Sequence, residues 1–111
     1  LLPVLNRLDV TTLNRVKLNL QPRTEKIIKG LFHTDLGGDM DEETMKTWTT
    51  SVYYINTNDG YTEFENGEKV KSAENRIVKF QSNLKHRGTT CTDEQTRVVI
   101  NFNYLPLHKR I

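Results

Sequence analysis

Hydrophobic and polar residues alternate with a period near two along most of this chain. Residues 12–20 place aliphatic side chains on one face, at Val16, Leu18 and Leu20. The opposite face is polar and includes Lys17 and Asn19. Strict alternation of this kind is typical of a half-buried strand, so we expect the aliphatic face to be buried and the polar face to meet solvent.

Similar patterns predict further strands. Alternation, or enrichment in β-branched and aromatic residues, occurs at residues 26–33, 47–56, 61–64, 68–70, 75–80, 84–87 and 96–104. Gly30 weakens the strand at 26–33 or marks a bulge in it. Turns are expected at residues 58–60 and at Asn66-Gly67, where Asn, Asp and Gly tolerate turn geometry. In the last strand, Arg97, Val99 and Asn101 share one face.

The spacing of these segments predicts an all-β fold. About eight short strands separated by regular turns favour a β-sandwich or a jelly roll. A weak helix signal at residues 41–46 is short and polar, so we expect minimal helix. The acidic stretch that contains it, residues 36–46, is either a lid beside a site or a disordered connector.

Length and composition limit the classes of protein. The 111 residues are enough for one domain, which we take as 1–111. The first residue is not Met, which suggests trimming or a fragment that lacks supporting N-terminal elements. No apolar run is long enough for a membrane span. The single cysteine excludes an internal disulfide and favours a reducing compartment, and a net charge of +2 gives no strong signal for polyanions.

Four residues suggest metal chemistry. In an extended segment, His33 and Asp35 point the same way because residues two apart share a face. His86 lies at the end of a later strand and Arg97 on the last one. Two histidines and one carboxylate form the facial set that binds non-haem Fe(II). A buried arginine can hold a carboxylate through two parallel hydrogen bonds.

Residues 32–104 resemble the 2-oxoglutarate- and Fe(II)-dependent oxygenases, specifically the prolyl 4-hydroxylase-like branch and its small bacteriophage forms. The resemblance covers about two-thirds of the chain. The residues that carry it are Phe32-His33-Thr34-Asp35, Val52-Tyr53-Tyr54-Ile55-Asn56, Asp59-Gly60-Tyr61-Thr62-Glu63-Phe64, Asn75-Arg76-Ile77-Val78-Lys79-Phe80, His86-Arg87-Gly88 and Arg97-Val98-Val99-Ile100-Asn101-Phe102.

The resemblance implies a double-stranded β-helix, the jelly roll that cupins also adopt. It implies that His33, Asp35 and His86 bind iron. It also implies that 2-oxoglutarate chelates the iron through its 2-oxo and C1-carboxylate oxygens, with its C5-carboxylate on Arg97 and Tyr54.

Three further residues complete the expected co-substrate pocket. The resemblance places polar residues near the C1 end of 2-oxoglutarate, and Lys17 and Asn19 hold comparable positions. Asn101 shares the face of Arg97 and is expected to line the same pocket.

The implied activity is hydroxylation of a C–H bond, coupled to decarboxylation of 2-oxoglutarate to succinate and CO₂. The implied cofactors are Fe(II), 2-oxoglutarate and O₂, with ascorbate as an auxiliary reductant. Peptidyl-proline or another protein substrate is favoured, with nucleic acid or a small metabolite as alternatives. A cytoplasmic location is expected, which is the host cytoplasm for a phage-encoded protein. The rival class is a jelly-roll binding or structural module, for example in a virion, that has no turnover.

Each candidate residue also has a simpler interpretation. His33, Asp35 and His86 then form a solvated rim without metal. Arg97 is then a surface cation paired with Glu94 or Asp93. Tyr54 is then a core aromatic residue, and Lys17 and Asn19 face solvent on an edge strand.

Overall fold

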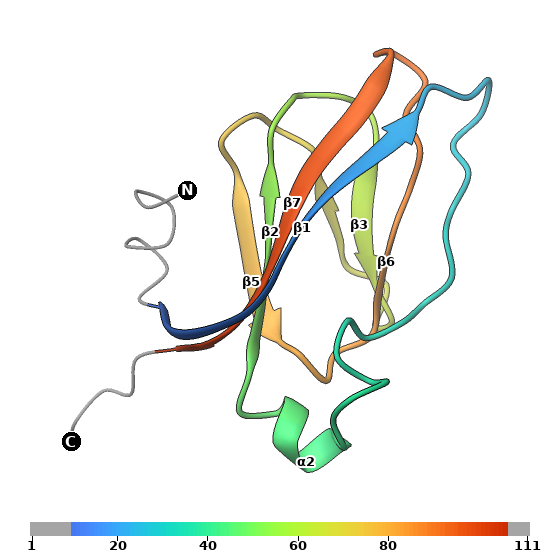
Figure 1. Ribbon diagram of the computed structural model, residues 1–111. Helices are drawn as coiled ribbons and strands as arrows, with labels where there is room; N and C mark the ends of the chain where they lie inside the picture. Colours follow the sequence, from blue (N-terminus) through green and yellow to red (C-terminus); the bar gives the residue numbers. More distant parts are fainter. Residues whose placement is uncertain (1–9, 107–111) are drawn as a thin grey trace.

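The computed structural model describes residues 10–106, which form two antiparallel sheets (Figure 1). The four-stranded sheet contains, in spatial order, β1 (Val10–Pro22), β7 (Thr96–Pro106), β2 (Thr49–Tyr54) and β5 (Ile77–Gln81). The three-stranded sheet contains β4 (Lys69–Lys71), β3 (Tyr61–Phe64) and β6 (His86–Gly88). One short helix, α2 (Glu42–Met45), precedes β2. The predicted all-β fold is confirmed, with seven strands among the described residues.

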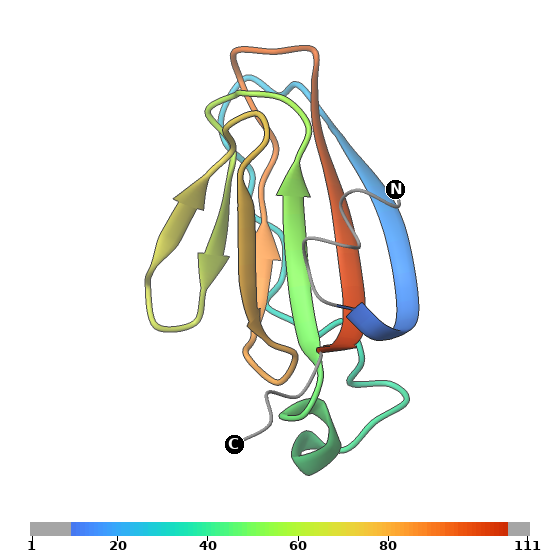
Figure 2. The ribbon, with the colours of Figure 1, turned by 90° about the vertical axis from the view of Figure 1, so that its left-hand side faces the viewer.

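The two sheets face each other as the layers of a jelly roll (Figure 2). β1 pairs along its length with β7, and β2 pairs with the other side of β7. Through this register Leu18, Ile100 and Tyr53 lie side by side across three strands. The prediction that supporting N-terminal elements are missing concerns a part of the protein outside residues 10–106.

The prediction about the buried face of the strand at 12–20 is wrong. Leu18 and Leu20 are 58% and 60% exposed, and Val16 is also exposed. The polar side chains Lys17 and Asn19 line cavities between the sheets instead. The physical reason is that the interior beside β1 is a polar cavity rather than an apolar core, so the alternation is kept but its orientation is reversed.

One apolar cluster lies farther along the inner face of the four-stranded sheet. Val52, Tyr54 and Val99 form a buried cluster, against which Val70, Val78 and Phe80 pack. Polar side chains on the same sheet are satisfied within it: the hydroxyl of Thr50 donates to Oδ1 of Asn103 over 2.8 Å. This core fixes β2 and β7, the two strands that support one wall of the cavity.

The prediction of a strand at 26–33 is wrong as a continuous strand. The segment runs extended beside β6 (Figure 1) but forms only isolated bridges, Lys29 with Thr89 and His33 with His86. Between them, the N–H of Gly30 donates to the carbonyl of Gly88 over 2.9 Å. These separate contacts are sufficient to hold His33 against the three-stranded sheet.

The acidic stretch at 36–46 adopts a turn followed by α2. Asp41 caps the helix, because its Oδ1 accepts from the N–H of Thr44 over 2.8 Å. Leu36 and Met45 are buried and anchor the two ends of the stretch, which contradicts a disordered connector. Within residues 10–106, no helix has the length and apolar character needed to cross a membrane.

Candidate metal centre and its adjoining cavities

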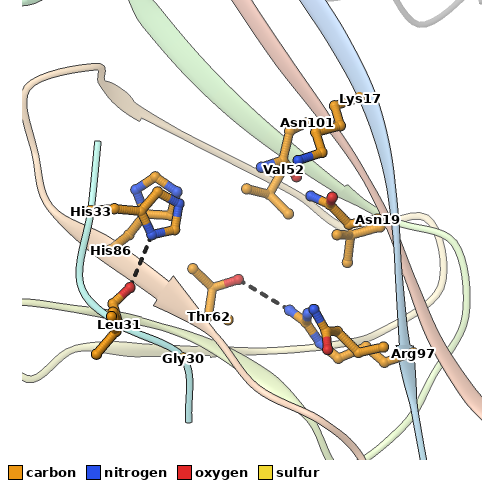
Figure 3. Close-up of a pocket in the computed structure, with 13 residues that line it drawn as sticks. Lys17, Asn19, Gly30, Leu31, His33, Val52, Thr62, His86, Arg97 and Asn101 are labelled. Carbon is orange, nitrogen blue, oxygen red and sulfur yellow. Dashed lines mark hydrogen bonds between the residues drawn. The ribbon is translucent and has the colours of Figure 1, made fainter. Parts of the chain in front are cut away.

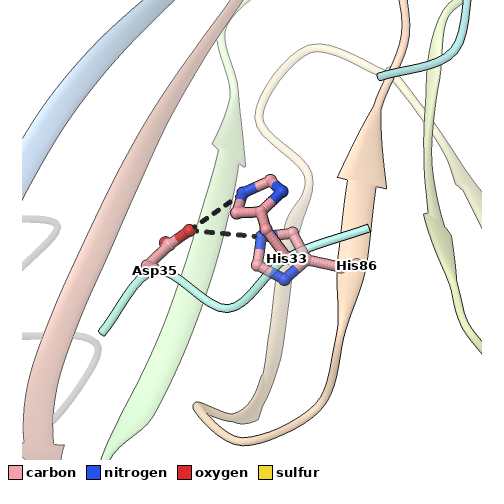
Figure 4. Close-up of side chains that lie close together, drawn as sticks. All are labelled: His33, Asp35 and His86. Carbon is pink, nitrogen blue, oxygen red and sulfur yellow. Dashed lines mark ion pairs between the residues drawn. The ribbon is translucent and has the colours of Figure 1, made fainter. Parts of the chain in front are cut away.

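His33, Asp35 and His86 converge on one point between the sheets (Figure 4). One ligand atom from each lies within 4.8 Å of the other two. Oδ1 of Asp35 is 3.3 Å from Nε2 of His33 and 3.5 Å from Nε2 of His86. His33 and Asp35 therefore point the same way, as their spacing predicts, and His86 from β6 joins them as the third residue of the group.

Backbone carbonyls orient both histidine rings. Nδ1 of His33 is 3.0 Å from the carbonyl oxygen of Leu31, and Nδ1 of His86 is 3.4 Å from that of Leu84. Because a carbonyl only accepts, each Nδ1 is placed to donate to it, so that each Nε2 could present its lone pair to a metal ion. This hydrogen bond to the second ring nitrogen is the usual support of a metal-binding histidine.

The side chain of Asp35 is fixed from two directions. The amide of Asn103 donates to its Oδ2 over 3.3 Å, which leaves Oδ1 facing the histidines. The guanidinium group of Arg15 donates to its backbone carbonyl over 3.2 Å. Burial raises the pKa of Asp35, but the imidazole groups of His33 and His86 beside it outweigh this and hold the pKa far below its usual range. The carboxyl group is thus ionised, as a metal ligand must be.

A divalent cation fits these residues. Nε2 of His86 is buried and has no hydrogen-bond partner within the described residues. A buried nitrogen lone pair without a partner is costly, and a metal ion at this point would satisfy it. Two imidazoles and a carboxylate suit iron, and three ligands on one side leave other coordination positions open.

The centre is open on one side and closed on the other. The side chain of His33 is 51% exposed, whereas that of His86 is 4% exposed. The hydrogen bond with Asp35 raises the pKa of His33 above its usual value. A substrate can therefore approach past His33, while His86 is shielded beneath it.

A cavity of about 450 Å³ adjoins the centre between the two sheets (Figure 3). Its volume is typical of a small-molecule site. Both metal-site histidines and Arg97 contribute to its walls. The remaining lining residues are Lys17, Asn19, Gln21, Gly30, Leu31, Val52, Thr62, Gly88, Val99 and Asn101.

Arg97 is a buried cation without a carboxylate partner. Arg97 is 3% exposed, and it forms no ion pair among residues 10–106. Its Nε donates to Oγ of Ser72 over 3.0 Å, and a second nitrogen donates to Oγ1 of Thr62 over 3.4 Å. Burial lowers the pKa of Arg97. The interpretation as a surface cation paired with Glu94 or Asp93 is therefore wrong.

Two glycines leave room for the arginine. A Cβ atom on Gly60 would lie 2.5 Å from Cδ of Arg97 and 2.8 Å from the carbonyl oxygen of Thr90. A Cβ on Gly88 would lie 3.2 Å from Nη1 of Arg97. Gly60 ends the predicted turn at residues 58–60, where its N–H donates to Oδ1 of Asn58 over 2.8 Å, and its φ is not in the positive range. Its role is to allow the close approach of Arg97.

Tyr54 lies behind the cavity wall rather than in it. Its side chain is fully buried, and its hydroxyl donates to Oγ1 of Thr62 over 2.7 Å. Arg97 lies over the Tyr54 ring, with 5.8 Å between Cζ and the ring centroid. Since Thr62 accepts from both neighbours, its own hydroxyl proton is free to donate into the cavity.

Lys17, Asn19 and Asn101 line the larger cavity and also a second, smaller cavity of about 170 Å³. The smaller cavity is completed by Arg15 and by residues of the metal centre. Oδ1 of Asn101 is buried and has no hydrogen-bond partner among the described residues. Lys17 is exposed and Asn19 is half-buried, so Lys17 faces solvent as well as lining the cavities, and only Asn19 departs from the interpretation as a solvent-facing residue.

Thr62 and Arg15 are two polar wall residues that were not among the site residues predicted from the sequence. Thr62 gave no signal, because threonine is common in strands for reasons of packing. Arg15 did carry a signal, since it lies two residues before Lys17 and so shares its face.

Comparisons with known proteins define the class of fold. No family model matches this sequence, and no curated protein matches it. Among solved structures, it is similar to a cupin protein from Bacteroides fragilis, with a TM-score of 0.61 and 12% sequence identity. The match covers 97% of this chain and 80% of that one. The protein therefore has a cupin-like jelly-roll fold that carries a possible His-Asp-His metal site.

Proposed function

We propose that this protein is an Fe(II)- and 2-oxoglutarate-dependent dioxygenase. The observation that carries the proposal is the combination of the His33, Asp35 and His86 set with the unpaired Arg97 in one cavity. Overall, 2-oxoglutarate, O₂ and a substrate R–H give succinate, CO₂ and R–OH. The iron, when bound, supplies the oxygen activation that couples the two oxidations.

The group of His33, Asp35 and His86 alone would fit any metal-binding cupin and does not distinguish a dioxygenase. Arg97 makes the proposal specific, because burying a guanidinium group without a counter-ion is costly. A carboxylate ligand that reaches Arg97 would offset that cost through charge-assisted hydrogen bonds. A dicarboxylate with a 2-oxo group has one end suited to the metal and the other suited to Arg97.

The remaining walls have defined tasks in this proposal. Thr62 donates its hydroxyl proton to the carboxylate held by Arg97, and Tyr54 fixes Thr62 from behind. Lys17, Asn19 and Asn101 bind polar atoms nearer the metal. Val52 and Val99 contact the methylene groups between the two carboxylates and exclude water.

We further propose a protein substrate, with peptidyl-proline first, because of the resemblance to the prolyl 4-hydroxylase-like branch. Nucleic acid and small metabolites are the alternatives. A reducing cytoplasm agrees with the free thiol of Cys91 and with a need to keep iron ferrous, where ascorbate would assist.

The test is an anaerobic titration of the purified protein with Fe(II) and then with 2-oxoglutarate. Chelation of the metal by the 2-oxo acid gives a weak visible charge-transfer band. We expect the band only when both Fe(II) and 2-oxoglutarate are present. His86→Ala should give no band, because it should not bind the metal. Arg97→Met should shift the titration to higher 2-oxoglutarate concentrations.

A matched control is Arg76→Met, since Arg76 is exposed, donates to the backbone carbonyl of Lys71 and does not line the cavity. Its titration should equal that of the wild type. A folded protein that binds Fe(II) but gives no band with 2-oxoglutarate would contradict the dioxygenase and favour a metal-binding jelly-roll module.

A further inference from the structure

The smaller cavity beside the metal centre has its own arginine. Arg15 lines this cavity and not the larger one, whereas Arg97 lines only the larger one. The two cavities share His33, Lys17, Asn19 and Asn101. A single metal centre is thus flanked by two separate cationic compartments.

The two cations of the smaller compartment are not paired with an acidic side chain among the described residues, although the carboxylate of Asp35 lines the same cavity. Neither Arg15 nor Lys17 forms an ion pair among residues 10–106. Arg15 is half-buried and is held toward the cavity by its 3.2 Å hydrogen bond to the carbonyl of Asp35. Lys17 stands at the exposed opening, where both cavities meet.

Basic residues on an edge strand have a simpler role, which is to prevent pairing with the edges of other sheets. Such residues serve that role when they extend into solvent. Arg15 instead contacts the backbone of a proposed metal ligand and lines an internal space. Its placement is therefore better explained by a ligand in that space.

We propose that the smaller cavity binds a carboxylate group of the primary substrate, with Arg15 as the main contact and Lys17 as the second. This inference rests on the proposed function, in which Arg97 and the metal hold 2-oxoglutarate. It adds that the substrate presents a carboxylate group near the hydroxylated carbon, which in a peptide is an acidic side chain or a C-terminal carboxylate beside the modified residue.

The size and charge of the cavity favour a carboxylate over a phosphate. About 170 Å³ admits one end group of a substrate and not a whole nucleotide. Asp35 also lines the cavity, and its negative charge repels a phosphate dianion more than a singly charged carboxylate. One planar guanidinium group matches the two oxygens of a carboxylate.

The test uses acetate as the probe and backbone amide NMR as the measurement. The protein is loaded with Zn(II), which coordinates without redox chemistry, and saturated with 2-oxoglutarate so that the Arg97 compartment is filled. Acetate should cause saturable shifts at residues 14–19 and 33–36, with a dissociation constant of about 1–10 mM. Acetamide, its neutral isostere, should cause none.

Variants assign the effect to one residue. Arg15→Gln should weaken acetate binding at least about tenfold, and Arg15→Lys should give an intermediate result. Arg23→Gln is the matched control, because Arg23 is an exposed arginine just beyond β1 that lines neither cavity. Its binding of acetate should be unchanged, and the amide spectrum of every variant reports whether the fold is intact.

The proposal is overturned if acetate causes no saturable shifts, if Arg15→Gln binds it as well as the wild type, or if only phosphate binds. Failure of the proposed function is recognised separately. If 2-oxoglutarate does not bind, the acetate titration is repeated without it in Arg97→Met. Acetate-induced shifts that persist in Arg97→Met and are absent from the double variant Arg15→Gln/Arg97→Met still support a carboxylate site at Arg15.

Discussion

His33 and His86 exchange two backbone hydrogen bonds, each 3.0 Å long. Their rings consequently lie 4.6 Å apart between centroids. The relative position of the two proposed metal ligands is therefore set by main-chain pairing between the extended segment and β6. Replacing one imidazole leaves this pairing intact, since no side chain takes part in it.

From this pairing we expect His33→Ala to abolish metal binding while the protein stays folded. The His33 side chain is half-exposed, and its ion pair with Asp35 is partly solvated. The loss of folding free energy should therefore be about 1 kcal/mol or less. Calorimetric titration with Mn(II) and a thermal melt of the metal-free protein measure the two effects.

The matched control is His108→Ala, which changes a histidine outside the described residues. It should leave Mn(II) affinity unchanged. His86→Ala should lose the metal too, but with a larger fall in stability, because its buried ring packs edge-on against Phe80 with 4.9 Å between centroids. Wild-type Mn(II) affinity in His33→Ala would remove His33 from the metal set.

A second prediction concerns Arg97, where function and stability should move in opposite directions. Arg97→Met removes the charge-assisted contact to 2-oxoglutarate, worth about 1.5–3 kcal/mol, so the KM for 2-oxoglutarate should rise about ten- to a hundredfold. The same change removes a buried cation without a counter-ion, so the metal-free protein should melt at the same or a higher temperature. Steady-state succinate assays and calorimetry provide the two values.

Arg97→Lys separates charge from shape. Lysine keeps the charge but cannot offer two parallel donors, so its KM should lie between those of the wild type and Arg97→Met. If neither Arg97→Met nor Arg97→Lys changes the KM for 2-oxoglutarate, the co-substrate does not bind at Arg97.

A third prediction distinguishes the roles of Thr62 and Tyr54. Thr62→Val removes the hydroxyl that faces the cavity, so the KM for 2-oxoglutarate should rise by about tenfold. Tyr54→Phe removes the bond that orients Thr62 and a longer bond to the carbonyl of Val70, and it should have a smaller effect in the same assay. Tyr53→Phe is the control, because the Tyr53 hydroxyl donates to Asn75 away from the cavity. A larger effect of Tyr54→Phe would indicate direct contact with the co-substrate.

The sequence predicted the strands better than it predicted which face of them is buried. Alternation defines two faces, but burial of one depends on what lies opposite. In β1 the opposite space is a polar cavity, so Lys17 and Asn19 line it from one face of the strand, while Leu18 on the other face is exposed. Hydrophobicity alone cannot reveal this, because the usual rule assumes an apolar interior.

The candidate site was predictable to different degrees for different residues. The proximity of His33 and Asp35 follows from local strand geometry. The approach of His86 depends on long-range pairing and was inferred from the resemblance alone. Thr62 could not be recognised, since its role depends on hydrogen bonds with two residues on other strands.

A fourth prediction concerns the ion pair that links β3 to β6 next to His86. Glu63 accepts from Nε of Arg87 over 2.8 Å, and a second guanidinium nitrogen lies 2.6 Å away. The hydrogen bond from Arg87 lowers the pKa of Glu63 below its ordinary value of 4.5. A lowered folded-state pKa adds stability at pH values above the unfolded-state pKa, and this stability is lost as pH falls through the folded-state pKa.

Glu63→Gln should therefore melt at a lower temperature than the wild type at pH 7, and the difference should disappear under acid conditions. Thermal melts between about pH 3 and pH 7 measure this, with the exposed Glu68→Gln as the control that should follow the wild type throughout. A Glu63→Gln difference that persists unchanged at the acid end would show that the side chain acts through packing rather than charge.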